Sequence, residues 1–200
     1  QVDNCEIRVN AAELPGCDGS SLPFVEAIEK AGIESQDTPR ATLRIREVTR
    51  VGDDDSWVEI SPPKGKNKNT LTIRYKLDYG QNNPIGKQAY EVIVTPTNFK
   101  KELASARTFL LEAEAQLLRS QGMCARCTNK DVLVLGEEGV IDNTLRFEDE
   151  CVRHKALDLV GDLALAGYDL QGSVVACKSG HRLNAEVVRQ WKMLRTIEAS

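Results

Sequence analysis

The sequence predicts an α+β protein, a two-layer sandwich in which helices cover one side of a β-sheet. Two observations lead to this prediction. Short segments between residues 42 and 94 are rich in β-branched residues or alternate apolar with polar ones, which is typical of strands. The proline-free segment Phe147–Ala166 repeats its apolar residues with the period of a helix.

The predicted helix Phe147–Ala166 carries a row of polar side chains four residues apart. His154, Asp158 and Asp162 therefore follow one another along one stripe of the helix. An imidazole and a carboxylate one turn apart can bind a divalent metal, and a further carboxylate can orient a nearby histidine. The alternative is a ladder of solvated ion pairs. The expected solvent face is supplied by Glu150, Arg153 and Lys155, and the expected apolar side by Val152, Ala156, Leu159, Val160, Leu163 and Ala164.

Composition limits the function classes. The chain has 200 residues, of which 41% are hydrophobic and 28% charged, and such a length builds one good core or two small ones. No run of 18 apolar residues occurs, so no stable membrane insertion is expected. A net charge of −4 with interleaved signs argues against generic nucleic-acid binding. Six scattered cysteines fit no disulfide framework, which predicts reduced thiols and a cytoplasmic location.

The amino-terminal part is predicted to be distinct from the rest. Cys5–Asn10 alternates apolar and polar residues and is expected to form a half-buried strand. A turn-rich loop, Pro15–Ser21, precedes a short helix at Leu22–Ala31 that Gly32 should end. The polar segment Glu34–Pro39 is the candidate linker.

The remaining elements follow in order. A run of hairpins predicts antiparallel pairing. Strands are expected at Thr42–Val51, Trp57–Ile60, Thr70–Leu77, Gln88–Val94, Val132–Leu135 and Ser173–Cys177. Helices are expected from Pro96, with Thr95 as N-cap, to about Ala106, at Glu112–Gln121 and at Asn184–Leu194.

Three further places could carry chemistry. His181 follows Gly180 in a predicted turn between a strand and a helix, and an Asp162–His181 pair would keep the imidazole charged and able to donate a proton. The alternative is a histidine without a function near a helix start. The Thr108 hydroxyl could donate to an oxyanion, although a local turn is the more common role. Cys124 and Cys127 form a single CxxC motif, which is a weak zinc signal.

Four stretches, taken in order, resemble the UDP-3-O-acyl-N-acetylglucosamine deacetylases, the zinc enzymes that commit bacteria to lipid A synthesis. The resemblance runs colinearly from about Val2 to Leu194. The four stretches are Glu13–Phe24 (ELPGCDGSSLPF), Ala106–Phe109 (ARTF), Phe147–Asp162 (FEDECVRHKALDLVGD) and Lys178–Asn184 (KSGHRLN).

The resemblance implies a tandem fold of two similar α+β domains that face each other across a zinc site. Residues 1–36 would be the carboxy-terminal remnant of the first domain, most of which is missing. Residues 37–200 would form the second domain, with a strand–helix–strand insert at about 108–135.

The resemblance also implies roles for the polar candidates. His154 and Asp158 would be two ligands of the Zn²⁺ cofactor. His181 would be a charged acid that stabilises the oxyanion and protonates the leaving amine, with Asp162 orienting it. Thr108 would polarise the amide carbonyl of the substrate.

The substrate implied is a small molecule, a UDP-sugar that carries an acyl chain. Lys155 would meet its anionic head group. The insert would form an apolar passage for the acyl chain, with contacts from Phe109, Leu111, Ala115 and Leu118. The protein is expected to act as a monomer.

The chain departs from the family in two respects. It contains no Glu-His pair, which in the family supplies the general base and the third zinc ligand, so both are expected upstream of Gln1. Cys124 and Cys127 also stand where relatives often carry a glycine-rich loop, which leaves the preferred acyl length open. Two alternatives remain, a binding module that keeps the acyl or nucleotide-sugar pocket without catalysis, and a structural zinc-thiolate protein.

Overall fold

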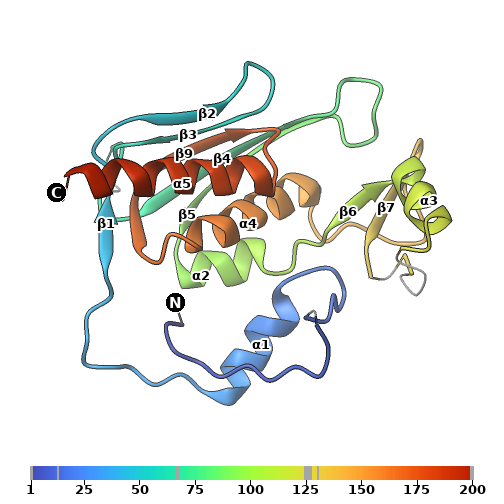
Figure 1. Ribbon diagram of the computed structural model, residues 1–200. Coiled ribbons are helices and arrows are strands. Elements are labelled where there is room, and N and C mark those ends of the chain that lie inside the picture. The colour runs from blue at the N-terminus through green and yellow to red at the C-terminus, as the bar shows by residue number, and fades with distance from the viewer. Residues whose placement is uncertain (1, 13, 66–67, 124–127, 130, 199–200) are drawn as a thin grey trace.

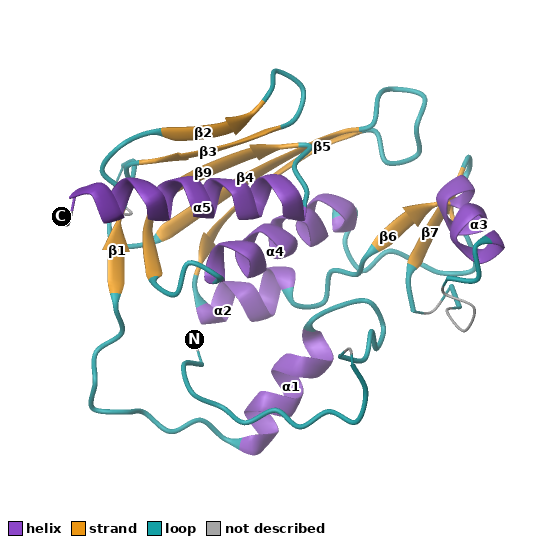
Figure 2. Cartoon of the chain, viewed as in Figure 1, coloured by secondary structure: helices purple, strands orange, loops and turns teal. Residues whose placement is uncertain are grey.

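The computed structural model describes residues 2–12, 14–65, 68–123, 128–129 and 131–198, with side chains as far as residue 192. Helices lie against one face of a mixed β-sheet, so the chain has two layers (Figures 1 and 2). The predicted α+β class is confirmed. None of the described helices combines the length and the apolar composition needed to cross a membrane.

In the main sheet, the strand that comes last in the chain, β9, lies in the middle. Its strand order is β2-β3-β9-β4-β5, and β1 pairs with the first residues of β9. The strands are β1 (Thr42–Arg44), β2 (Thr49–Gly52), β3 (Trp57–Ser61), β4 (Leu71–Asp78), β5 (Lys87–Val94) and β9 (Asp169–Cys177).

The expected run of hairpins is only partly correct. The hairpins β2–β3 and β4–β5 are antiparallel, but β9 lies between β3 and β4 and runs parallel to β4. The single strand predicted at Thr42–Val51 is also wrong, because β1 pairs in parallel with β9 whereas β2 pairs antiparallel with β3. The two strands run in the same direction but pair with different partners, and residues 45–48 between them belong to no strand.

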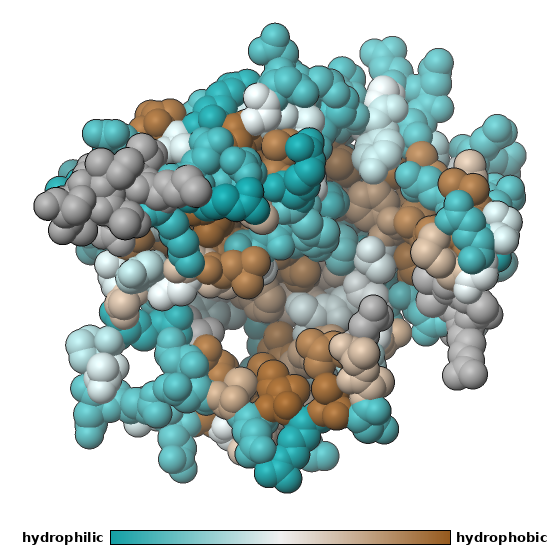
Figure 3. All heavy atoms as spheres, viewed as in Figure 1, coloured by the Kyte–Doolittle hydropathy of each residue, from teal (hydrophilic) through white to brown (hydrophobic). Residues whose placement is uncertain are grey.

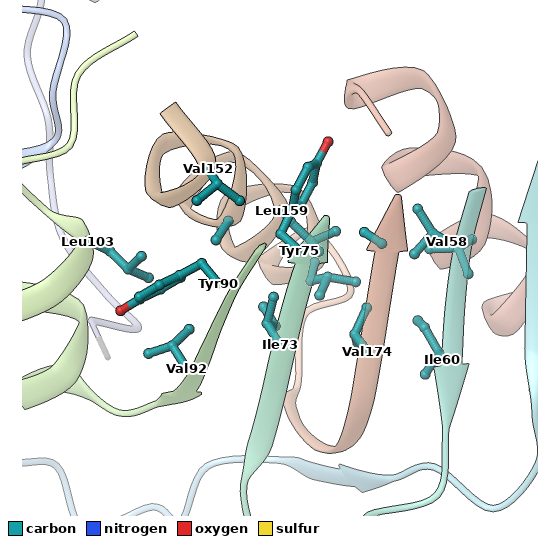
Figure 4. Packing of buried hydrophobic residues seen from close by; sticks show 14 of the residues in the cluster. Val58, Ile60, Ile73, Tyr75, Tyr90, Val92, Leu103, Val152, Leu159 and Val174 are labelled. Atoms are coloured by element: carbon teal, nitrogen blue, oxygen red, sulfur yellow. The ribbon is translucent and has the colours of Figure 1, made fainter. Parts of the chain in front are cut away.

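The core lies between this sheet and two helices, α4 (Glu150–Ala164) and α5 (His181–Glu198). Alternate residues of β4, such as Ile73 and Tyr75, point to the helices, and Val152 and Leu159 of α4 meet them (Figure 4). Alternation on the strands and helical spacing on α4 thus bring two apolar surfaces together. Of the apolar side predicted for α4, Val152, Ala156, Leu159 and Leu163 are buried, Val160 is partly buried and Ala164 is exposed.

Helix α4 begins three residues later than predicted, at Glu150, and this glutamate is fully buried instead of facing solvent. Its Oε1 atom accepts hydrogen bonds from the backbone N–H (3.0 Å) and Nε (2.8 Å) of Arg107. Its Oε2 atom accepts from Arg107 Nη2 (3.1 Å) and from the backbone N–H of Arg146 (2.6 Å). The side chain thus ties Arg107 and the loop residue Arg146 to the first residue of α4.

Arg107 has further partners, so the buried guanidinium is well satisfied. Its Nη1 donates to Asn143 Oδ1 (3.0 Å) and its Nη2 to the carbonyl of Thr144 (2.7 Å). A buried ion pair needs such additional hydrogen bonds to offset the loss of hydration of both charges. The pair ties the residues that precede the insert to the start of α4.

The residues expected to form the insert build most of a second, three-stranded sheet. Helix α2 (Pro96–Asn98), with the Thr95 hydroxyl accepting from Asn98 N–H (3.1 Å), continues as a π-helical turn over Phe99–Leu103. The insert follows, with β6 and β7 parallel and β8 antiparallel to β7. Its elements are β6 (Phe109–Leu111), α3 (Glu112–Ser120), β7 (Leu133–Gly136) and β8 (Gly139–Val140).

The amino-terminal segment contains α1 (Leu22–Ala31), as predicted, but the predicted strand Cys5–Asn10 is wrong. Residues 5–10 are exposed, and no described strand lies beside them to pair with. Between α1 and the main sheet lies an apolar groove of about 620 Å³, lined in part by Ile28 and Phe99. Figure 3 shows hydrophobic side chains gathered on α1. The division of the chain near residue 36 stays a prediction.

We expect Glu150→Ala to lower the free energy of unfolding by about 3–5 kcal/mol, because the change leaves the Arg107 guanidinium buried without its counter-charge. Urea denaturation of the wild-type and variant chains, followed by circular dichroism, measures this difference.

The matched control is Glu6→Ala, which breaks an ion pair with Arg8 that is exposed on both sides. This variant should unfold at almost the wild-type urea concentration, because exposed ion pairs contribute little. Equal destabilisation by Glu150→Ala and Glu6→Ala would contradict the structural role of the buried pair.

Candidate functional site

The predicted stripe on α4 exists, and its first two members meet. His154 is 9% exposed, and its Nε2 lies 3.3 Å from Asp158 Oδ1 one turn further along the helix. Its Nδ1 lies 3.1 Å from the backbone carbonyl of Ala106. Because a carbonyl only accepts hydrogen bonds, Nδ1 carries the proton and Nε2 keeps its lone pair. The free lone pair of His154 and an oxygen of Asp158 therefore lie side by side.

The environment favours the form of His154 that binds metals. Burial lowers the pKa of His154, against the opposing effect of the Asp158 carboxylate, so the imidazole is neutral at pH 7. Two donors of a tetrahedral zinc ion, each about 2.0–2.2 Å from the metal, lie about 3.3–3.6 Å apart. The 3.3 Å between the two side chains fits such an ion. Asp158 also accepts from Lys155 Nζ (2.8 Å) through its other oxygen.

Two donors do not complete a metal site. Among the described residues, no group of three or more His, Cys, Asp or Glu side chains gathers in a way that could hold a metal ion. The candidate thiolates Cys124 and Cys127 lie outside the described residues. The four cysteines in the described ranges are unpaired: Cys5, Cys17, Cys151 and Cys177.

The third member of the stripe, Asp162, pairs with His181, as predicted. His181 Nδ1 lies 2.9 Å from Asp162 Oδ2 and 3.1 Å from Oδ1. The Asp162 side chain is largely buried, whereas that of His181 is 73% exposed. Since Nδ1 faces the carboxylate, Nε2 is the nitrogen left to act on a bound molecule.

The position of His181 in the chain differs from the prediction. It is the first residue of α5, whereas the helix was expected to begin at Asn184. The N–H of Asn184 donates to the carbonyl of Gly180 (3.0 Å), and this bond already closes a helical turn around His181. The imidazole is thereby fixed to a helix end instead of a free turn.

A hydrogen bond from the main sheet holds the turn before His181. The Tyr75 hydroxyl on β4 donates to the backbone carbonyl of Ser179. Burial raises the pKa of Tyr75 above its usual range, so the hydroxyl keeps its proton. Sequence reasoning did not identify Tyr75, because its spacing on β4 is that of any core residue.

Thr108 is held between two segments that are far apart in the chain. Its N–H donates to the carbonyl of Gly19 (2.8 Å), and its own carbonyl accepts from the N–H of Leu133 (2.9 Å). Gly19 has a φ of +79°, and a Cβ atom there would lie 2.6 Å from the carbonyl oxygen of Asp131. Only glycine fits this close approach without strain.

Most of these side chains, although not that of Asp162, line one cleft of about 730 Å³. Of the candidates predicted from the sequence, Thr108, Phe109, His154, Lys155, Asp158 and His181 line it. Leu111, Ala115 and Leu118 belong to the insert and do not line the cleft. Ala115 is buried, whereas Leu111 and Leu118 are partly buried.

The cleft wall also contains residues that the sequence did not reveal. The ring of Phe109 packs edge-on against His154 (centroids 6.4 Å apart) and against Tyr79 (6.3 Å). Tyr79 is the first residue after β4, before the turn at Gly80. Its position at the end of a strand was the only feature of the sequence that could have marked it as a cleft residue. Lys178 lines the cleft as well, and its Nζ pairs with Asp55 Oδ1 (2.6 Å).

Comparison with known proteins assigns the family. A family model described as UDP-3-O-acyl N-acetylglycosamine deacetylase matches residues 1–192. A UDP-3-O-acyl-N-acetylglucosamine deacetylase of Mannheimia succiniciproducens is 39% identical over 192 residues, covering 94% of this chain and 61% of the relative. Enzymes of the same name from Actinobacillus succinogenes (38%, covering 94% and 61%) and Shewanella sp. strain W3-18-1 (37%, covering 94% and 60%) are similar.

The chain spans about three fifths of the length of these relatives. The family match nevertheless extends over nearly all of its residues and includes every side chain of the cleft described above. The resemblance inferred from the four sequence stretches is thereby confirmed. The chain belongs to the UDP-3-O-acyl-N-acetylglucosamine deacetylase family.

Proposed function

We propose that this chain carries one wall of the active site of a zinc-dependent deacetylase. Its substrate is UDP-3-O-acyl-N-acetylglucosamine, from which it removes the acetyl group by hydrolysis. The resemblance implies that this reaction commits the cell to lipid A synthesis. The observation that carries this proposal is the convergence of His154 Nε2 and Asp158 Oδ1 at 3.3 Å in the cleft. Membership of the family supports the choice of substrate.

His154 and Asp158 would hold the metal, with Lys155 balancing the charge of the second carboxylate oxygen. Zinc, when bound, supplies a Lewis acid that polarises the acetyl carbonyl and makes water a competent nucleophile at neutral pH. The bond from His154 Nδ1–H to the Ala106 carbonyl keeps the imidazole in the ligating tautomer.

His181 would donate the proton that the leaving amine requires. When the carbon–nitrogen bond of the tetrahedral adduct breaks, the nitrogen takes a proton from His181 Nε2. Asp162 stays hydrogen-bonded to Nδ1 and keeps the imidazole oriented during that transfer. The Thr108 hydroxyl would donate to the carbonyl oxygen as negative charge develops on it.

The third zinc ligand and the general base would come from sequence outside these 200 residues. The chain contains no Glu-His pair, and its described residues gather only two donors. The relatives are longer than this chain, so they have room for both groups. We therefore expect zinc affinity and turnover to require the full translation product of the gene.

The insert would bind the acyl chain. Phe109 already lines the cleft, and the partly buried Leu111 and Leu118 would extend an apolar surface away from it, with the buried Ala115 supporting them from below the surface. Lys155, at the cleft, would also approach the anionic head group of the substrate. The cytoplasmic location and the monomeric state expected from the sequence stay predictions.

His154→Ala should abolish stoichiometric zinc binding by the full translation product, because one ligand of a two-ligand helix site is lost. Elemental analysis after gel filtration measures the zinc content. The matched control is His181→Ala, which removes the only other histidine of the 200 residues and should keep the zinc. Unchanged zinc in His154→Ala would overturn the assignment of the ligand.

His181→Ala should lower kcat for UDP-3-O-acyl-N-acetylglucosamine by about 10²–10⁴, because a general acid is removed. Asp162→Asn should lower kcat through the same group, so the double variant should be little worse than His181→Ala alone. Steady-state kinetics with measured zinc content tests this. If the two losses multiplied in full, His181 and Asp162 would act separately and the pairing would have no catalytic role.

A further inference from the structure

The Asp162–His181 pair has a third member that the chemistry above does not use. Asn184 is 1% exposed and lies one turn after His181 on α5. Its Nδ2 donates to Asp162 Oδ2 (2.8 Å), the same oxygen that lies 2.9 Å from His181 Nδ1. The first turn of α5 thus contacts one carboxylate oxygen with two side chains.

The orientation of the Asn184 amide follows from its partner. A carboxylate accepts hydrogen bonds and donates none, so the NH₂ group of Asn184 must face Asp162. The Asn184 Oδ1 atom is then buried, and the described chain offers it no hydrogen-bond partner. Burying an unpaired oxygen costs free energy. The charge-assisted bond to Asp162 is the compensation that the structure shows for this cost.

His181 needs such support more than a buried residue would. Its side chain is 73% exposed, so packing hardly restricts the rotation of the imidazole. Asp162 can orient the ring only if its own carboxylate is fixed. The Asn184 donor fixes Oδ2 from inside the protein, where solvent cannot compete for it.

We propose that Asn184 is a positioning residue, which holds the Asp162 carboxylate so that His181 presents Nε2 to the cleft. This inference deepens the proposed function and rests on it for its catalytic consequence. The geometric part, that Asn184 sets the orientation of His181 through Asp162, can be tested without any turnover.

The test uses the 200-residue chain labelled with ¹⁵N-histidine, free of metal. Only two histidines occur, so both imidazoles can be assigned by substitution and followed by NMR. When His181 is neutral, the Asp162 carboxylate should favour the tautomer protonated on Nδ1. Asn184→Ala and Asn184→Leu should each shift the tautomer ratio of His181 toward Nε2–H about two- to tenfold, as expected for the loss of one hydrogen bond.

The controls separate positioning from general damage. Asn184→Leu keeps the buried volume, and the His154 resonances report whether the fold around α4 is intact. Tyr75→Phe removes a buried hydrogen bond from the turn before His181 but leaves Asp162 untouched, so it should keep the wild-type tautomer ratio. Asp162→Asn changes the partner of His181 itself, so it should give the largest shift in the tautomer ratio.

A wild-type ratio in Asn184→Leu, with a shifted ratio in Asp162→Asn, would overturn the proposal. An equal shift in Tyr75→Phe would also overturn it, because any loosening of the turn would then suffice. If Asp162→Asn left the tautomer ratio unchanged, Asp162 would not orient His181. Both the positioning role of Asn184 and the acid role of His181 would then be overturned.

In the full translation product, Asn184→Leu should lower kcat at constant zinc content and nearly constant KM. A wild-type kcat would overturn the catalytic consequence. Absence of deacetylase activity in the wild-type product would instead contradict the proposed function. The NMR result would still decide whether Asn184 orients His181.

Discussion

The buried ion pair between Arg107 and Glu150 is the interaction on which the candidate site depends. Glu150 accepts from both the backbone and the side chain of Arg107, so it fixes the chain at this residue in position and direction. On one side of Arg107 lies Ala106, whose carbonyl holds His154 in its tautomer, and on the other lies Thr108. One carboxylate therefore positions both the chain segment that contacts His154 and the residue Thr108.

Features that depend on local sequence could be predicted. The helix with His154 and Asp158 on one stripe follows from spacing alone, and Thr95 before Pro96 marks a helix start by its chemistry. The place of β9 between β3 and β4 could not be predicted, because strand pairing joins residues more than a hundred positions apart. The burial of Glu150 was missed for the same reason, since its partner Arg107 lies 43 positions away.

In the candidate site, too, some features could be predicted from local sequence and others could not. The pair Asp162–His181 was predicted, because the strand between the two residues returns the chain to the helix that it has just left. Asn184 and Tyr75 were not, because a single asparagine in a helix and a tyrosine at a core position of a strand carry no distinguishing pattern. Their contacts appear only once α4, α5 and β4 are packed together: Asn184 bonds to the Asp162 side chain, and Tyr75 bonds to the backbone of Ser179.

The central claim is that zinc binds in the cleft through nitrogen and oxygen donors that include His154 and Asp158. X-ray absorption at the zinc edge, recorded on the zinc-loaded full translation product, tests it most directly. If His154 and Asp158 are ligands, the first shell consists of nitrogen and oxygen atoms alone, at about 2.0–2.2 Å, with the scattering pattern of imidazole. Sulfur scatterers at about 2.3 Å would place the metal on cysteine thiolates and rule out this assignment.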